Sequence, residues 1–298
     1  MAINVNLPVP SEKQRLFLLD KHKNVGFGGS RGGGKSFAVR IKAISACLAY
    51  NGLTCTIVRK TYPELTANHI EPICNMLKVG SSDAVATYNK SEKELRFVNG
   101  SKILFRYCNN EQDAARFQGT ETDLMFLDEA TQLTEMQMRK LTACVRGTNG
   151  FPKRIYYTCN PGGVSHGYIK RIFIDKKYEE GEDADSYSFI QSSVFDNKAL
   201  LNANPDYLKQ LEALPPKLRD AWLYGRWDVF QGAYFEEFRD SPDVDLCHTA
   251  GIETDQALIE RRYTHVIEPF DIPKDWKIRR GANGFKLTKQ TGALLLIR

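Results

Sequence analysis

Short apolar runs alternate with polar, glycine-rich corners along the first half of the chain. Runs of four to eight apolar residues are typical of strands that are buried on both faces of a parallel sheet. We therefore predict an α/β fold, in which a strand at 24–27 leads into a glycine-rich loop and a helix at 36–50 follows. Further buried strands are predicted at 54–59, 124–127 and 154–159.

Two other patterns complete the predicted layout. An Asn-Gly pair, Asn99-Gly100, separates the strand-like runs ELRFV and SKILFRY, which indicates an antiparallel hairpin. Beyond residue 165 the segments are charged, aromatic and helix-like, and Pro215-Pro216 separates two short helices. We interpret this part as a small helical lid or linker subdomain.

The amino-acid composition is consistent with this predicted α/β fold and adds little to it. Hydrophobic residues make up 42% and charged residues 26% of the 298, which is ordinary for a folded globular protein and unlike a disordered chain. The formal charge of +5 is mildly basic and permits contact with nucleic acid. The seven cysteines form no CxxC pair and have no histidine at zinc spacing, so they indicate reduced thiols. With no signal pattern and no apolar run long enough for a membrane span, we expect a cytoplasmic protein without membrane contact.

The loop after the first strand has the spacing of a Walker A motif, and we predict that it binds ATP. In such loops, backbone N–H groups turn onto phosphate oxygens, a lysine reaches the β- and γ-phosphates, and a hydroxyl binds Mg²⁺. A flexible surface loop is the alternative, but the position between strand and helix favours the phosphate site. The predicted ATP ligands in this loop are Gly29, Ser30, Arg31, Gly32, Gly33, Gly34, Lys35 and Ser36, with Ser36 also a metal ligand.

Two further residues near this loop are candidates for nucleotide contact. Arg31 adds a cation that could stabilise charge developing on the γ-phosphate, although it could equally face solvent. Gln14 precedes the first strand, and its amide has both a donor and an acceptor for the adenine edge.

The strand at 124–127 ends in Asp128-Glu129, which is a Walker B pattern. A buried strand there delivers the first carboxylate to Mg²⁺ and the second to the attacking water. We therefore predict Asp128 as a metal ligand and Glu129 as the catalytic base or water-positioning residue. A strand-end acidic pair alone is common, and the upstream Walker A motif is what gives it weight.

A third strand ends in Thr158-Cys-Asn160-Pro161, where Asn160 could sense the γ-phosphate or simply begin a turn. The residues alone favour the turn. Because ligands bind outside the carboxyl ends of the strands in open α/β sheets, the three motifs are expected to share one cleft. Arg139 and Arg146 follow the Walker B strand, and either could act as an arginine finger for a neighbouring subunit.

With these motifs in this order, the sequence resembles the large terminase subunit of tailed bacteriophages over residues 8 to 276. The features that carry the resemblance are Lys13-Gln14, GGSRGGGKS with Arg31, Arg59-Lys60-Thr61, Arg116-Phe-Gln-Gly119, FLDEAT, TCNPGG, and the stretch from SSVFDN to LYGRW.

The resemblance implies a P-loop NTPase core of the RecA-like (ASCE) type and an ATP-driven motor that moves double-stranded DNA into a procapsid in the host cytoplasm. It implies a homo-oligomeric ring docked on a portal protein, with a small terminase subunit as partner. It also makes Asn160 the residue that couples hydrolysis to movement, and Lys35, Arg31 and Glu129 the other catalytic residues.

The chain departs from the family after Asp275. Large terminases continue into a nuclease domain that needs several carboxylates for two metal ions, whereas no Asp or Glu follows Asp275 here. We therefore expect no nuclease activity. The predicted division is an ATPase core at 1–165, the rest of that core with the lid or linker subdomain at 166–240, and a linker with a truncated or aberrant nuclease start at 241–298.

Two alternative functions stay open at this point. One is a helicase-like ATPase that depends on nucleic acid, although the stacking platforms that bind single strands are not evident. The other is a truncated relative that binds the portal, the small terminase subunit or DNA without acting as a motor.

Overall fold

The structure, a computed structural model, describes residues 5, 7–117, 119–230 and 244–260. The chain divides into two units, Met1–Gln231 and Gly232–Arg298. In the second unit the described residues form two short helices, α11 (Val244–Ala250) and α12 (Thr254–Ile259). The rest of the predicted nuclease start at 241–298 lies outside the described residues.

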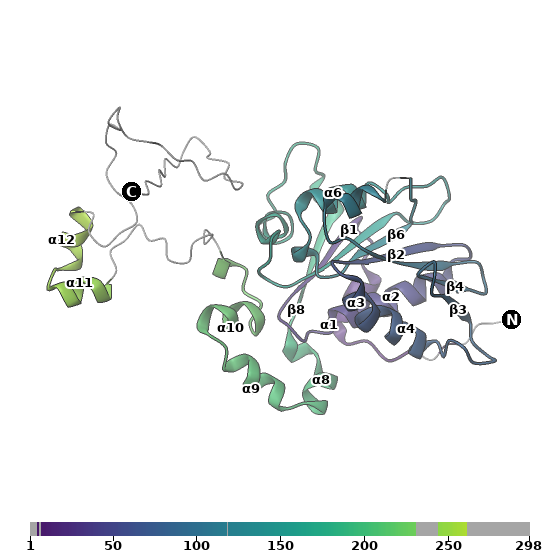
Figure 1. Cartoon of the computed structure of the whole chain (residues 1–298), viewed down its shortest axis with the longest axis horizontal. Helices are drawn as coiled ribbons and strands as arrows, with labels where there is room; N and C mark the ends of the chain where they lie inside the picture. The colour runs from purple at the N-terminus through teal and green to yellow at the C-terminus, as the bar shows by residue number, and fades with distance from the viewer. Residues whose placement is uncertain (1–4, 6, 118, 231–243, 261–298) are drawn as a thin grey trace. The chain divides into compact units, whose positions relative to one another are not determined.

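The first unit contains one eight-stranded sheet with the order β3-β4-β5-β2-β6-β7-β1-β8 (Figure 1). The strands are β1 (Asn24–Gly29), β2 (Thr54–Arg59), β3 (Ala86–Asn89), β4 (Glu94–Phe97), β5 (Lys102–Tyr107), β6 (Leu124–Leu127), β7 (Arg154–Cys159) and β8 (Tyr187–Ser192). The six strands from β5 to β8 in this order pair in parallel, while β4 and β3 are antiparallel at one edge. A mostly parallel α/β sheet is therefore confirmed.

The apolar runs marked the central strands correctly. The strands β2, β6 and β7 have the predicted bounds, and β1 extends two residues further, to Gly29. Every residue of β6 is buried, as a run without polar alternation predicts. The Asn-Gly hairpin is confirmed as β4 and β5, whereas β3 and β8 were not predicted.

Helices cover both faces of the sheet. Residues of α1, α2, η1 and α4 pack in one hydrophobic cluster, and residues of α5, α6, α7 and η3 pack in another on the opposite face. Figure 1 shows α6 on one side of the strands and α1 to α4 on the other. The helices concerned are α1 (Glu12–Leu19), α2 (Lys35–Ala49), α3 (Tyr62–Leu65), the π-helical turn η1 (Thr66–Ile70), α4 (Glu71–Met76), α5 (Glu111–Ala115), η2 (Ala130–Gln132), α6 (Glu135–Thr142), α7 (His166–Ile169) and the π-helical turn η3 (Lys170–Ile174).

Aromatic rings fasten α1 to the sheet. The ring of Phe17 stacks on Phe27 with centroids 5.0 Å apart and meets the edge of Tyr156 at 5.2 Å. The ring of Tyr156 stacks in turn on Phe126 at 4.8 Å. All four side chains are fully buried. This stack anchors β1, β6 and β7, the three strands whose ends carry the Walker and asparagine motifs.

Apart from the strand β8, the last described part of the first unit is helical. It comprises η4 (Ala184–Ser186), η5 (Val194–Asp196), α8 (Lys198–Ala203), α9 (Asp206–Glu212), α10 (Pro216–Trp222) and η6 (Asp228–Phe230). The predicted helices on either side of Pro215 are confirmed as α9 and α10. A small separate hydrophobic cluster of Val194, Leu211 and Leu223 holds them together. None of the helices described is long and apolar enough to cross a bilayer.

Candidate active site

The glycine-rich loop joins β1 to α2, as its sequence predicted. Three of its glycines adopt backbone angles that other residues rarely take, with φ of 137° at Gly29, 78° at Gly32 and 75° at Gly34. A Cβ atom on Gly29 would lie 2.2 Å from the carbonyl oxygen of Ser192, so only glycine fits there. The loop ends at the N-terminus of a 15-residue helix, where unpaired N–H groups and the helix dipole favour an anion.

Lys35 is buried at the start of α2, and its ammonium group reaches across the loop. The Nζ atom donates to the carbonyl of Ser30 at 2.6 Å and to Oδ1 of Asn160 at 2.7 Å. Burial lowers the pKa of Lys35, while the nearby Glu129 carboxylate opposes that change. The lysine is thereby held between the phosphate-binding loop and the end of β7.

Asp128, at the end of β6, is surrounded by donors and cations. Ser36 Oγ and Thr158 Oγ1 donate to it at 3.1 and 2.5 Å, and Arg59 Nε and His69 Nε2 lie 2.9 and 2.8 Å away. Burial alone would raise the pKa of Asp128, but the charges and hydrogen bonds of His69 and Arg59 outweigh burial and lower it. Asp128 is therefore ionised next to the Ser36 hydroxyl.

Glu129 follows in a left-handed backbone conformation, with φ of 57°. Its N–H donates to Thr158 Oγ1 at 3.0 Å, and both carboxylate oxygens accept from Asn160 Nδ2, at 3.0 and 2.9 Å. Burial raises the pKa of Glu129, and the neighbouring charge of Asp128 raises it further. A non-glycine residue held in this conformation is typical of functional sites, where the surroundings fix a strained backbone.

Asn160 connects the two motifs. Its Oδ1 accepts from Lys35 while its Nδ2 donates to Glu129, so one side-chain amide bridges the Walker A lysine and the Walker B glutamate. The three motifs therefore share one site at the carboxyl edge of the sheet, as the topology led us to expect.

Gln14 is buried in α1 and also contacts the loop. Its Oε1 accepts from the Ser11 N–H at 2.8 Å in a capping box, and its Nε2 donates to the carbonyl of Gly34 at 3.1 Å. This places the glutamine beside the first turn of α2. Its contact with adenine stays a prediction.

Arg31 lies on the surface of the loop and packs against α10. The guanidinium carbon of Arg31 is 3.3 Å from the centroid of the Trp222 ring. The backbone N–H of Arg31 donates to the Trp222 carbonyl at 2.7 Å. The loop is thus attached to the helical part of the unit. A catalytic role for Arg31 stays a prediction.

The two arginine-finger candidates lie on the surface and pair with carboxylates of the same chain. Arg139 on α6 is 2.7 Å from Glu135, and Arg146 is 3.7 Å from Glu121. A role for either arginine at the site of a neighbouring subunit stays a prediction.

Two residues of the site were missed in the sequence. Arg59 belongs to the motif at the end of β2, but nothing in that motif predicts its contact with Asp128. His69 is fully buried in η1, and a lone histidine 59 positions from its carboxylate partner gives no local signal. The π-helical turn that carries it is a feature often found at functional sites, but it is visible only in the structure.

A glycine loop, an acidic pair and an asparagine at neighbouring strand ends of a mostly parallel sheet define a P-loop NTPase. The family model described as phage terminase large subunit matches residues 21–226, which is more than half of the chain. The chain therefore belongs to the phage terminase large subunit family.

Solved structures show the same fold. The large terminase from a thermophilic bacteriophage, in complex with ADP, is similar with a TM-score of 0.60 and 19% identity, over 73% of this chain and 53% of that one. The same terminase in complex with ATP-gamma-S gives a TM-score of 0.57 and 20% identity, over 73% and 52%. The present chain thus spans about half the length of these terminases. No curated protein matches its sequence.

Proposed function

We propose that this chain is the ATPase motor subunit of a viral terminase, which hydrolyses ATP to move double-stranded DNA into a procapsid. The observation that carries this proposal is the bridge from Lys35 through Asn160 to Glu129. It joins the lysine of the phosphate-binding loop to the carboxylate that acts on water. Membership of the terminase family supports double-stranded DNA as the substrate that the motor moves.

The chain's own groups account for nucleotide binding. Backbone N–H groups of residues 32–36 would face the phosphates at the N-terminus of α2, whereas those of Ser30 and Arg31 donate to carbonyls of the same chain. The Lys35 ammonium neutralises the β- and γ-phosphates. Gln14, which donates to the Gly34 carbonyl, is the residue that we propose contacts the base. Arg31 leaves Trp222 to reach the γ-phosphate as negative charge develops there.

The residues present also fit Mg²⁺. A hydroxyl and an ionised carboxylate, Ser36 Oγ and Asp128 Oδ2, lie 3.1 Å apart beside the phosphate-binding loop. In the part of the chain that the structure describes, no three His, Cys, Asp or Glu side chains cluster as metal ligands. Mg²⁺ commonly uses one or two carboxylates together with substrate phosphates and water, which agrees with this donor set. When bound, the ion neutralises charge on the transferred phosphoryl group.

Glu129 is the residue that acts on the attacking water. The pKa of Glu129 is raised toward neutral pH, which makes its carboxylate a stronger base for abstracting a proton from water. Asn160 fixes both carboxylate oxygens and also contacts Lys35, so a change at the γ-phosphate is passed to the water-activating group through one amide. This gives Asn160 its proposed coupling role.

The partners follow from the family. The motor would contact backbone phosphates of double-stranded DNA, because a packaging machine must act on any sequence. A homo-oligomeric ring on a portal protein, a small terminase subunit and a place in the host cytoplasm complete the proposal. In that ring Arg139 or Arg146 would enter the site of a neighbouring subunit. Cleavage of DNA is not proposed for this chain.

The test is steady-state ATP turnover with and without double-stranded DNA. We expect DNA to raise the turnover of the wild type, and Asn160→Ala to lower turnover about 100-fold, the usual effect of losing a positioned donor. Asn149→Ala removes an exposed asparagine from a surface loop and should leave turnover unchanged. Equal turnover in wild type, Asn160→Ala and Lys35→Ala would overturn the proposal.

A further inference from the structure

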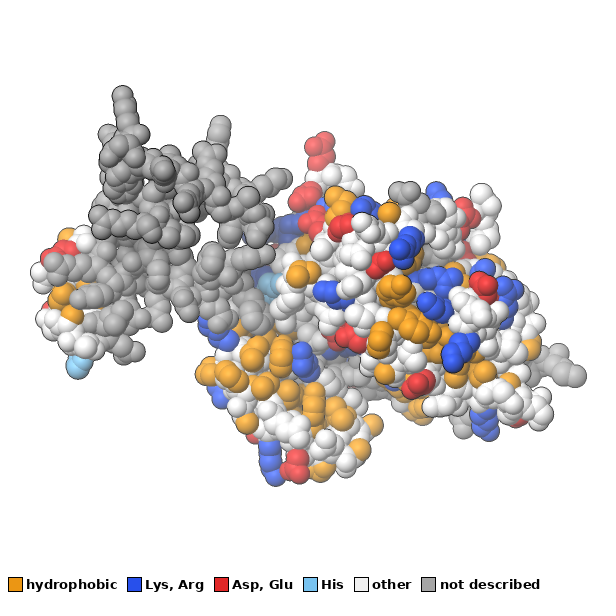
Figure 2. Space-filling model, in the orientation of Figure 1, with side chains coloured by type: hydrophobic (Ala, Val, Ile, Leu, Met, Phe, Trp, Pro, Cys, Tyr) orange, Lys and Arg blue, Asp and Glu red, His pale blue; other side chains and the backbone are white. Residues whose placement is uncertain are grey.

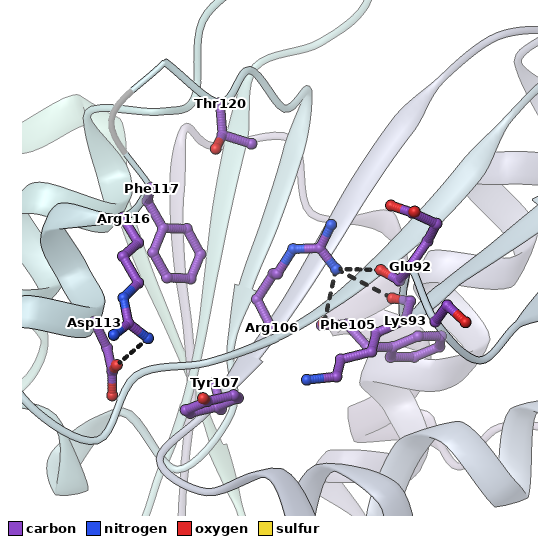
Figure 3. A pocket seen from close by; sticks show the side chains of 10 residues that line it. Glu92, Lys93, Phe105, Arg106, Tyr107, Asp113, Arg116, Phe117 and Thr120 are labelled. Carbon is purple, nitrogen blue, oxygen red and sulfur yellow. Dashed lines mark hydrogen bonds and ion pairs between the residues drawn. The ribbon is translucent and has the colours of Figure 1, made fainter.

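A second pocket lies on the same edge of the sheet, away from the ATP site. It has a volume of about 260 Å³ and is bounded by the β3–β4 turn, the end of β5 and the segment around Phe117 (Figure 3). The strand β5 lies four strand spacings from β1, which at about 4.8 Å each amounts to ~19 Å. The pocket is therefore separate from the phosphate-binding loop.

Lys93, in the β3–β4 turn, is held in a left-handed conformation with φ of 53°. Glycine is the residue that adopts this conformation without strain. The ammonium group sits 4.5 Å from the ring centroid of Tyr62 and 5.4 Å from that of Tyr107. No described carboxylate lies within salt-bridge distance of Lys93. A strained backbone that presents a cation without an acidic partner points to a ligand, because such strain gathers at ligand clamps.

Arg106 supplies a second cation on the same side of the pocket. Its Nη1 donates to the backbone carbonyls of Glu92, Lys93 and Phe105 at 3.1, 3.2 and 2.9 Å, which fixes the half-buried guanidinium against the turn. Figure 3 shows this side chain reaching from β5 to the turn. Among the described residues, neither Nε nor Nη2 has a hydrogen-bond partner. A fixed guanidinium with unused donors is suited to a phosphate group.

Arg116 and Phe117 form the opposite side (Figure 3). The Arg116 side chain is 73% exposed, and its Nη1 is 3.2 Å from Asp113. An exposed pair of this kind contributes little to stability, so Arg116 can exchange Asp113 for another anion. The pocket thus has three cations against two carboxylates, those of Asp113 and the exposed Glu92.

Figure 2 shows Lys and Arg side chains gathered around hydrophobic ones in the right-hand part of the first unit, over the region of α3, β3 and β4.

The pocket also has a backbone connection to the catalytic carboxylates. The Cys108 N–H, directly after β5, donates to the Arg59 carbonyl at 2.9 Å, and the Arg59 side chain contacts Asp128. A ligand at the end of β5 therefore lies next to β2, whose last residue, Arg59, contacts Asp128.

We propose that Lys93, Arg106 and Arg116 bind backbone phosphates of double-stranded DNA. This assignment rests on the proposed motor function and names the surface through which the first unit contacts its load. The proposed motor function is what favours DNA over an acidic peptide, because the fixed, planar guanidinium of Arg106 matches a phosphate or a carboxylate in two-donor geometry.

The test is binding of a fluorescently labelled 30-base-pair duplex, about three helical turns, measured by anisotropy over a series of salt concentrations. Lys93→Gly and Arg116→Gln should each weaken binding about tenfold and reduce the slope of log affinity against log salt by about 1. Glu92→Gln should tighten binding, because it removes a negative charge from the pocket. Lys209→Gln, which removes an exposed charge on α9, should change neither affinity nor slope beyond experimental error.

The melting temperature of each variant serves as the control for correct folding. Lys93→Gly should keep or raise the melting temperature, because glycine adopts the left-handed conformation without strain. Weaker DNA binding by an equally stable variant would then report on the side chain. Wild-type affinity and slope in both Lys93→Gly and Arg116→Gln would overturn the pocket assignment alone. Binding of polyglutamate in the pocket without binding of DNA would overturn it as well. Failure of the wild-type chain to bind DNA at any salt concentration would overturn the motor proposal too.

Discussion

Replacement of Asp128 by asparagine tests whether this carboxylate holds the site together. The residue is 1% exposed, and Ser36, Thr158, Arg59 and His69 all lie within 3.2 Å of its oxygens. Asparagine removes the charge and turns an amide N–H₂ toward existing donors. Breaking a buried pair in this way costs about 3–5 kcal/mol, because the remaining charge is left without a partner. For a unit of this size we expect the melting temperature to fall by roughly 6–20 °C.

The assay is thermal unfolding followed by circular dichroism in EDTA without nucleotide, so that ligand binding does not add to stability. Glu129→Gln is the matched control. The Glu129 side chain is 22% exposed, and glutamine keeps an acceptor for Asn160, so we expect a change of only a few degrees. A melting temperature of Asp128→Asn that matches that of Glu129→Gln would refute the reasoning, since Arg59 and His69 would not then depend on Asp128.

Three further predictions concern the fold around the site. Phe17→Ala should lower the free energy of unfolding by about 3–5 kcal/mol in urea, because the ring is fully buried in the aromatic stack, whereas Leu16→Ala, 48% exposed, should cost far less. Gly29→Ala should weaken ATP binding more than tenfold in a fluorescence titration, because a Cβ collides with backbone there, while Gly52→Ala, with open space around it, should bind normally. A thiol reagent at pH 8 should react first with Cys74, because the other six cysteines are buried. Burial and Glu71 also raise the pKa of Cys74, so its reaction should be slower than that of a free thiol, and all seven should react in denaturant.

The sequence predicts the centre of this fold better than its edges. The strands β2, β6 and β7 are flanked by other strands and covered on both faces, so 14 of their 16 residues are buried and each contains a recognisable apolar run. The edge strand β8 pairs only with β1, and five of its six residues are partly buried or exposed, so its polar residues conceal it.

The same limit applies to the site. Residues within a motif, such as Lys35 and Glu129, are visible because the chemistry of a phosphate loop fixes their spacing. The contact of His69 with Asp128 joins segments that periodicity cannot relate, since it depends on how η1 packs over the sheet. The left-handed backbone of Glu129 likewise follows from the surrounding contacts and not from its residue type.

The central claim is that the site between the phosphate-binding loop and Glu129 hydrolyses ATP, and one paired measurement tests it most directly. Steady-state ATP turnover of wild type and Glu129→Gln would be compared at an ATP concentration that saturates both, as shown by fluorescent-nucleotide displacement. Loss of a general base typically lowers the rate 10²- to 10⁴-fold, so we predict a fall of at least about 100-fold with binding retained. Equal turnover in the two proteins at equal occupancy would contradict the account.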